Sequence, residues 1–388
     1  MDSRSSTSSS RVRALPWAGL LAVALLLALD AGVLGTRGPW AALALRVQGA
    51  GAAPSGVADD RLALREIRSA PPERPRVFVL GSSRAAAGFD AEVAQRAFPG
   101  VAFARLGHPG VDPFVMRSLA EEVIASHAAA AVLVLSEIET HRPLRLEPIP
   151  GPGASAISLA AVADLVAETG PGIAWRNRES LYRLLVSSAL RGYRYRDVLR
   201  HAGLLDLIEF PLDPGRLSRP APATLGMHRI ALGEDFRNPV TPAMRRRLAE
   251  VLAALPRRWQ IAAMPEVDIL REVTPGIHVD VQLALVRRTV GRLREAGVGV
   301  VVVEAPVHPA GAALYPPRLR TDFRQFGAGL AEPPGVVFVP LDAMEPFEED
   351  DFKDLLHTGP QGSEKLTNGI VRGLEALRVD GIDPQGSP

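Results

Sequence analysis

The stretch Arg76-Val-Phe-Val-Leu-Gly-Ser-Ser-Arg84 decides how the rest of the chain is interpreted. It predicts a short buried strand over residues 77–80 that runs into a glycine and two serines, followed by a helix beginning near Asp90. The glycine permits a sharp turn at this point. Open α/β sheets bind their ligands beyond the carboxyl ends of the strands. The stretch therefore predicts a ligand or reaction site at its two serines.

Outward from this stretch, strands alternate with helices. Further strands are expected at residues 101–106, 131–136, 298–304 and 335–341, and helices at residues 112–126, 280–296 and 362–377. The run at 131–136 is almost entirely apolar, as a strand covered on both faces requires. The alternation predicts a three-layer α/β/α fold with a mostly parallel, five-stranded sheet.

Residues 142–279 interrupt this alternation. The region is rich in proline and loops, with helical patterns at 175–200 and 241–254. In the first pattern, Leu181 and Leu184 share one face and arginines lie opposite. We interpret the region as a helical insertion that covers or frames a site. Its arginine-rich face is more simply explained as a solvated helix surface than as a membrane contact.

Composition and charge exclude several classes of protein. The 388 residues suffice for one large α/β domain with additions. The net charge of +1 gives no electrostatic case for nucleic acid. The absence of cysteine excludes disulfides, thiolate metal sites and a cysteine nucleophile. Basic residues are almost all arginine, and lysine occurs only at Lys353 and Lys365.

The N-terminal segment has the pattern of a membrane anchor. Residues 1–13 are serine-rich and basic, and residues 14–35 are apolar apart from Asp30. About 20 apolar residues span a bilayer, and arginines before the segment favour a cytoplasmic N-terminus. We expect a transmembrane signal anchor, with the rest of the chain in the periplasm or at the cell surface; a cleaved signal peptide is the alternative. Residues 36–75 are expected to form a tether, and residues 379–388 a flexible tail.

Two short motifs carry the candidate chemistry. A serine at a strand end becomes a nucleophile only if a base takes its proton, and the one well-framed base lies in Asp354-Leu-Leu-His357. With these motifs, and with a glycine after the second strand (Gly107 or Gly110), the chain resembles the SGNH (GDSL-type) hydrolase superfamily. The resemblance covers residues 76–378, with the insertion unmatched. Gly81-Ser82-Ser83 stands where that family has Gly-Asp-Ser, and Gly362 fits the start of its last helix.

More narrowly, the chain is similar to membrane-anchored SGNH-like proteins that work beside membrane-bound O-acyltransferases on bacterial surface polymers. These include the D-alanyl-lipoteichoic acid protein and the alginate O-acetylation proteins. Shared features are an N-terminal anchor, an extracytoplasmic domain and a Gly-Ser-Ser first block. The resemblance implies an acylated glycan or cell-surface polymer as substrate and a membrane-bound O-acyltransferase as partner, with no cofactor and no metal.

The resemblance also implies a role for each motif residue. Ser83 would be the nucleophile, His357 the base and later the acid, and Asp354 the residue that orients the imidazole. Backbone amides of Ser83 and Gly107 would form the oxyanion hole. Ser83 is preferred over the competing Ser82 because the superfamily serine lies two residues after the glycine. The implied function is that of a serine esterase or O-acyltransferase.

The third block of the superfamily, Gly-x-Asn-Asp, is the main departure. Its asparagine donates to the oxyanion, whereas the third strand here ends in Ser136-Glu-Ile-Glu-Thr-His141. Losing one oxyanion donor costs on the order of a hundredfold in rate. The departure favours the alternative function of a non-catalytic SGNH-like binding or scaffold subunit in a membrane O-acylation complex.

Other polar residues at strand ends have simpler explanations. Glu137 and Glu139 could form a paired acid and base, but two such carboxylates more often mark a solvated strand end. His108 and His308 follow strand ends and could border a cleft, but singly they do not predict a metal site. No phosphate-binding loop and no dinucleotide fingerprint occurs.

Overall fold

The computed structural model describes residues 73–107, 111–141, 157–189, 279–312, 317–353 and 356–377, together with Leu21, Ala24, Leu25 and Ala28. Most of the expected anchor and tether, much of the insertion and the expected tail lie outside the described residues. Within the described part of the chain, no helix has the length and apolar character needed to cross a membrane.

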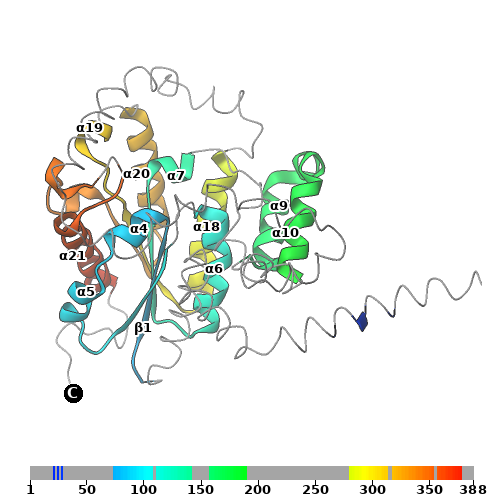
Figure 1. Ribbon diagram of the computed structural model, residues 1–388, viewed down its shortest axis with the longest axis horizontal. Coiled ribbons are helices and arrows are strands. Elements are labelled where there is room, and N and C mark those ends of the chain that lie inside the picture. The colour runs from blue at the N-terminus through cyan, green and yellow to red at the C-terminus, as the bar shows by residue number, and fades with distance from the viewer. Residues whose placement is uncertain are drawn as a thin grey trace, which may run out of the picture.

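Five parallel strands form one sheet in the order β2-β1-β3-β4-β5 (Figure 1). The strands are β1 (Arg76–Gly81), β2 (Ala102–Gly107), β3 (Ala130–Leu135), β4 (Gly299–Glu304) and β5 (Val336–Val339). The expectation of five strands is confirmed, and the sheet is parallel throughout.

Side chains of β1 alternate between two hydrophobic cores. Phe78 and Leu80 lie in one core, and Val77 and Val79 lie in the other. The first core is closed by helices α6 (Pro113–Ala125), α9 (Leu159–Arg176), α18 (Val279–Glu295) and α20 (Pro317–Leu330). The second is closed by α4 (Ser83–Gly88), α5 (Ala91–Ala97) and α21 (Pro360–Leu377). The two helical layers lie on opposite sides of the sheet in Figure 1, which confirms the three-layer architecture.

Several helices were not expected from the sequence. The expected helix near Asp90 is α5, capped by the Asp90 carboxylate, but α4 already begins at Ser83. A short helix, α7 (Glu137–His141), directly follows β3, and α20 precedes β5. The remaining short elements are α19 (Pro309–Ala312) and the 3₁₀ turns η2 (Leu341–Ala343) and η3 (Glu349–Asp351).

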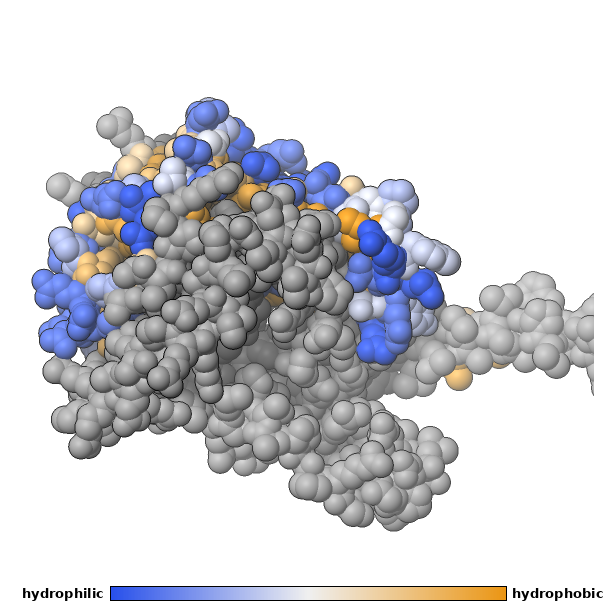
Figure 2. Space-filling view, turned by 90° about the horizontal axis from the view of Figure 1, so that it is seen from above, coloured by the Kyte–Doolittle hydropathy of each residue, from blue (hydrophilic) through white to orange (hydrophobic). Residues whose placement is uncertain are grey.

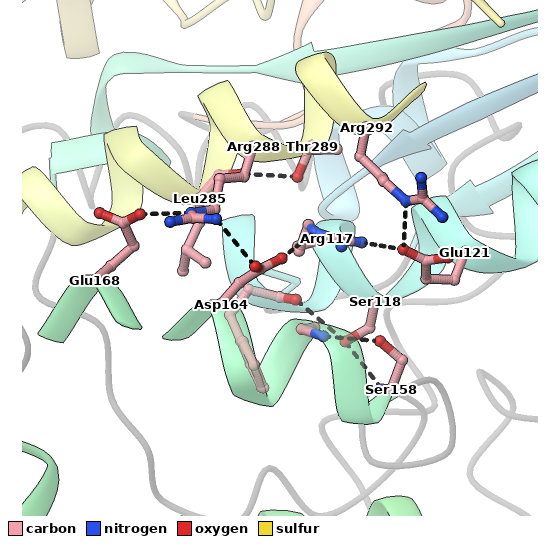
Figure 3. A network of polar contacts seen from close by, with 12 residues as sticks. Arg117, Ser118, Glu121, Ser158, Asp164, Glu168, Leu285, Arg288, Thr289 and Arg292 are labelled. Carbon is pink, nitrogen blue, oxygen red and sulfur yellow. Dashed lines mark hydrogen bonds and ion pairs between the residues drawn. The ribbon is translucent and has the colours of Figure 1, made fainter. Parts of the chain in front are cut away.

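The described part of the insertion is a helical hairpin. The helix expected at residues 175–200 corresponds, as far as it is described, to α10 (Arg178–Ala189), and the helix before it, α9, was not expected and is kinked at Gly170 and Pro171. Leu181 and Leu184 are buried as expected. Ion pairs connect α9 to α6 and α18, with Arg117 Nε 2.7 Å from Asp164 Oδ2 (Figure 3). This hairpin therefore extends one helical layer; the pattern at 241–254 lies outside the described residues.

The order of the strands in the sheet reverses its direction between β1 and β3. From β1 the chain crosses outward to β2, then returns to form β3 on the other side of β1. Ligands of open α/β sheets bind at such a reversal of strand order, beyond the carboxyl ends. The two serines follow β1 at this position, and α7 follows β3. Figure 2 shows the molecule from above, where the visible surface of the described residues is mostly hydrophilic with smaller hydrophobic areas between.

Candidate active site

The turn from β1 into α4 requires glycine. A Cβ on Gly81 would lie 2.5 Å from the Cβ of Ala85 and 2.9 Å from the carbonyl oxygen of Val134 in β3. Any side chain would therefore push α4 away from the sheet. Ser82 then caps α4, because its Oγ accepts the Arg84 N–H at 3.2 Å. Ser83 follows as the first residue of the helix, and it is only half-buried.

The structure brings Ser83 and His357 together. Ser83 Oγ lies 2.7 Å from His357 Nε2, although the two residues are 274 positions apart in the sequence. At this distance the serine hydroxyl can donate its proton to the lone pair of a neutral imidazole. The distance is also within the reach expected of a nucleophile and its general base.

His357 is presented by a short loop that closes on itself. Phe352 and Thr358 form an antiparallel bridge, and the Lys353 N–H donates to the His357 carbonyl at 2.9 Å. The Lys365 ammonium ties this loop to α21, lying 2.7 Å from the Asp351 carboxylate. These contacts fix the backbone on either side of the histidine. Asp354, the residue expected to orient His357, lies outside the described residues.

A second contact holds the serine turn from the side of β3. Ser82 Oγ donates to Glu139 Oε1, and Glu139 Oε2 accepts the Ser136 N–H at 3.2 Å. In return, the Glu139 N–H donates to Ser136 Oγ at 3.3 Å. Ser136 and Glu139 thus form a capping box at the start of α7. Its signature, a serine followed three residues later by glutamate, is visible in the sequence but was missed.

The expectation that Glu137 and Glu139 mark a solvated strand end was wrong. Their side chains are only 1% and 5% exposed. Both lie in α7, where the chain turns back over the sheet instead of continuing into solvent. Glu139 is occupied by the capping box and Ser82, so the two carboxylates do not form the paired acid and base that was considered.

Glu137 belongs to a cluster of buried charges. Burial raises the pKa of its carboxyl above the ordinary value of 4.5, while Arg84 and Arg320 oppose this increase. Arg84 comes from α4 and is 5% exposed. The fully buried Glu304 raises the pKa of Glu137 further, and it pairs with Arg324 at 3.1 Å.

The remaining candidates divide between the site and its surroundings. Gly107 ends β2 and lies beside Gly81 in the parallel register, so both are at the edge that carries Ser83. His108 and Gly110 lie outside the described residues. His308 is buried and packs edge-on against Phe352, with ring centroids 5.5 Å apart. It therefore supports the His357 loop. Within the described ranges, no group of three or more His, Asp or Glu side chains is placed to hold a metal.

Comparison with known proteins does not identify a family: no protein-family model matches the chain, and no curated protein matches it. What the described residues offer chemically is a half-buried serine hydroxyl and an imidazole in hydrogen-bonding contact. They lie where the strand order of a parallel sheet reverses. Such a pair can perform acyl transfer through a covalent intermediate.

Proposed function

We propose that the protein is an extracytoplasmic serine esterase or O-acyltransferase of the SGNH type. It acts on acyl esters, most simply acetyl esters, of a glycan or cell-envelope polymer. The observation that carries the proposal is the 2.7 Å contact between Ser83 Oγ and His357 Nε2. The strand order supports it, because it is the flavodoxin-like order on which SGNH folds are built.

The proposed reaction has two halves. Ser83 Oγ attacks the ester carbonyl while His357 takes the hydroxyl proton, and the collapse of the tetrahedral intermediate breaks the bond to the leaving alcohol. His357 returns the proton to that alcohol. In the second half, water or a polymer hydroxyl attacks the acyl-serine, and its proton passes through His357 back to Ser83. Asp354 would stabilise the charged imidazole during both halves.

The location and partners of the protein are part of the same proposal. The basic residues 1–13 and the apolar residues 14–35 support a single-pass anchor with the catalytic domain outside the cytoplasm. A membrane-bound O-acyltransferase would be the partner that supplies or accepts the acyl group. Both assignments follow from the resemblance stated above and from the N-terminal pattern.

Active-site labelling tests the proposal. The full chain in detergent is treated with a fluorophosphonate, beside Ser83→Ala, Ser82→Ala and His357→Ala. Ser118→Ala is the control, because Ser118 is a buried serine in α6 that bonds the Phe114 carbonyl. We expect labelling of the wild type and the control, none in Ser83→Ala and a strong reduction in His357→Ala. Loss confined to Ser82→Ala would move the nucleophile by one residue.

A non-catalytic binding or scaffold role is the second candidate. The observation that favours it is the third block, where α7 brings two buried glutamates and no asparagine to the end of β3. Folded wild-type protein that resists labelling, yet retains a membrane O-acyltransferase on affinity purification, would support this role over catalysis.

A further inference from the structure

The outer face of the α9–α10 hairpin is apolar, because the carboxylates of α9 bind to the rest of the domain. Asp164 accepts a hydrogen bond from Arg117 of α6. Glu168 pairs with Arg288 of α18 (Figure 3). Among the exposed residues of α9, only Arg176 at its end is charged. The others are Leu159, Ala160, Ala163, Val166, Ala167, Pro171, Gly172 and Trp175. A surface helix normally turns its charged side chains towards water, so this face indicates a partner other than water.

Exposed large apolar side chains occur in only two places in the described part of the chain. Leu21 and Leu25 belong to the expected anchor. All the others lie in the hairpin: Leu159, Val166, Trp175, Tyr182 and Leu185. Trp175 and Tyr182 are 70% and 67% exposed. Apolar side chains gathered in this way on one exposed element mark a surface that binds protein or membrane.

Basic side chains border the aromatic ones. The Arg178 guanidinium lies over the Trp175 ring, 5.0 Å from its centroid, and Arg176 is exposed. The one carboxylate of α10, Glu179, is paired with Arg183 at 2.5 Å. The exposed groups are therefore aromatic and net positive. Tryptophan and tyrosine beside arginine are typical of the membrane–water interface, where aromatic rings lie at the headgroups and basic side chains reach the phosphates.

We propose that the outer face of the α9–α10 hairpin lies on the surface of an anionic lipid bilayer. The inference uses the anchored location that is part of the proposed function. The expected anchor and tether would keep the domain close to one bilayer, so a face of modest intrinsic affinity would be occupied. The hairpin lies beyond α6 and α18 (Figure 1), and α4 and α21 cover the opposite side of the sheet. The layer of α4 and α21 would therefore face away from the lipid.

The sequence alone favoured a solvated surface for the arginines of this region. It did not show that Trp175 and Tyr182 are exposed beside them. It also did not show that Asp164 and Glu168 are taken up by ion pairs with α6 and α18, which leaves the outer face of α9 without a carboxylate that would repel anionic lipid.

The test uses single fluorescent labels, which the absence of cysteine makes possible. The full chain is reconstituted into vesicles of phosphatidylcholine and phosphatidylglycerol, with the polarity-sensitive dye NBD on Val166→Cys or Leu185→Cys. The control is Glu92→Cys, an exposed position in α5 in the opposite layer. Leu21→Cys reports on the expected anchor. We expect blue-shifted emission at positions 166 and 185, quenched by lipids that carry a doxyl group near the headgroup, and neither effect at position 92.

Substitution of the two aromatic residues tests the face itself. In Trp175→Ser/Tyr182→Ser the label at position 185 should lose both its blue shift and its quenching, while the label at position 21 is unchanged. Both side chains are exposed, so the fold should be retained, and circular dichroism checks this. Replacing phosphatidylglycerol by phosphatidylcholine should weaken the quenching at position 185, because the arginines then lose their anionic partners.

The possible failures can be told apart. Quenching at position 21 without quenching at 166 and 185 would leave the anchor in place and overturn the lipid contact. A blue shift at 185 without quenching would assign the face to a protein, such as a second copy of the chain. Equal quenching at position 92 would also overturn the inference. Quenching at 166 and 185 but not at 21 would support the lipid contact and reject the anchor, and quenching at none of these positions would reject both.

Discussion

Ser82 donates its hydroxyl proton to Glu139, a residue 57 positions later whose carboxylate also caps its own helix. The residue beside the candidate nucleophile is thus fixed by α7, and Ser83 is fixed by the His357 loop. A small turn is held from two sides of the sheet edge, which reduces the freedom of the Ser83 hydroxyl before substrate binds.

We expect Glu139→Gln to lower the rate of Ser83 labelling about tenfold and to destabilise the fold by about 1–3 kcal/mol. The amide keeps the shape but presents a donor to either Ser82 or the Ser136 N–H, so one bond is lost in a buried setting. Labelling kinetics and urea unfolding measure the two effects. Ser158→Ala is the control, because it removes the cap of α9 at a cost of about 1 kcal/mol and should leave labelling unchanged.

Glu137→Gln should become more stable relative to wild type as the pH rises. Burial raises the pKa of Glu137 above 4.5, so ionisation penalises the folded state. Below pH 4.5 the side chain is neutral in both states and the penalty is absent; it grows between 4.5 and the folded-state pKa. The gain is about 1.4 kcal/mol per unit of pKa elevation. Urea unfolding at pH 4 and pH 8 measures it, with the exposed Glu92→Gln as control. A difference that does not change with pH would contradict the assignment.

Asp164→Asn should cost about 2–3 kcal/mol, because it leaves the buried guanidinium of Arg117 without one of its two carboxylates. Asp164 also accepts from Arg288 at 3.2 Å, so one substitution weakens the attachment of α9 to both α6 and α18 (Figure 3). The comparison is Glu179→Gln, which breaks the exposed pair with Arg183 and should cost less than about 0.5 kcal/mol. Equal losses in urea unfolding would show that burial does not decide the effect.

Gly362→Ala should destabilise the His357 loop. The added methyl group would overlap the Asp351 carbonyl oxygen and lie 3.1 Å from a Thr358 carbon. Overpacking of this kind costs about 1–3 kcal/mol, and displacement of the loop should slow Ser83 labelling. Gly291→Ala in α18 is the matched helical substitution, because nothing lies within 4 Å of its added Cβ. It should stabilise the protein by about 0.5–1 kcal/mol.

The sheet was predictable because its strands are short apolar runs with clear ends. In β3 all six residues are buried, and the sequence shows this directly. The helix α7 was missed because Ser136 to His141 has no apolar periodicity. Its helical state depends on the capping box and on burial of both glutamates. The helix α9 was missed because Gly170 and Pro171, where it is kinked, gave its sequence the character of a loop-rich region.

Only part of the site could be inferred from residue order. The strand pattern placed Ser83 at the carboxyl edge of the sheet, and His357 was assigned as its base from the Asp-Leu-Leu-His motif and the resemblance. The contact of Ser82 with Glu139 depends on β1 and β3 being neighbours in the sheet. The order of strands in a sheet cannot be predicted from the periodicity of apolar residues. The burial of Arg84 likewise depends on how α4 packs against the sheet, and no sequence motif predicts that packing.

The proposed nucleophile Ser83 lies in α4, and its proposed base His357 lies shortly before α21, which packs on α4 and α5. During synthesis, Ser83 leaves the ribosome long before His357 exists. If the proposed chemistry holds, the serine stays inert until α21 packs onto α4 and α5. Reactivity at Ser83 would then report completion of the fold, and a chain that stops before residue 351 would be chemically silent even if its first strands had already paired.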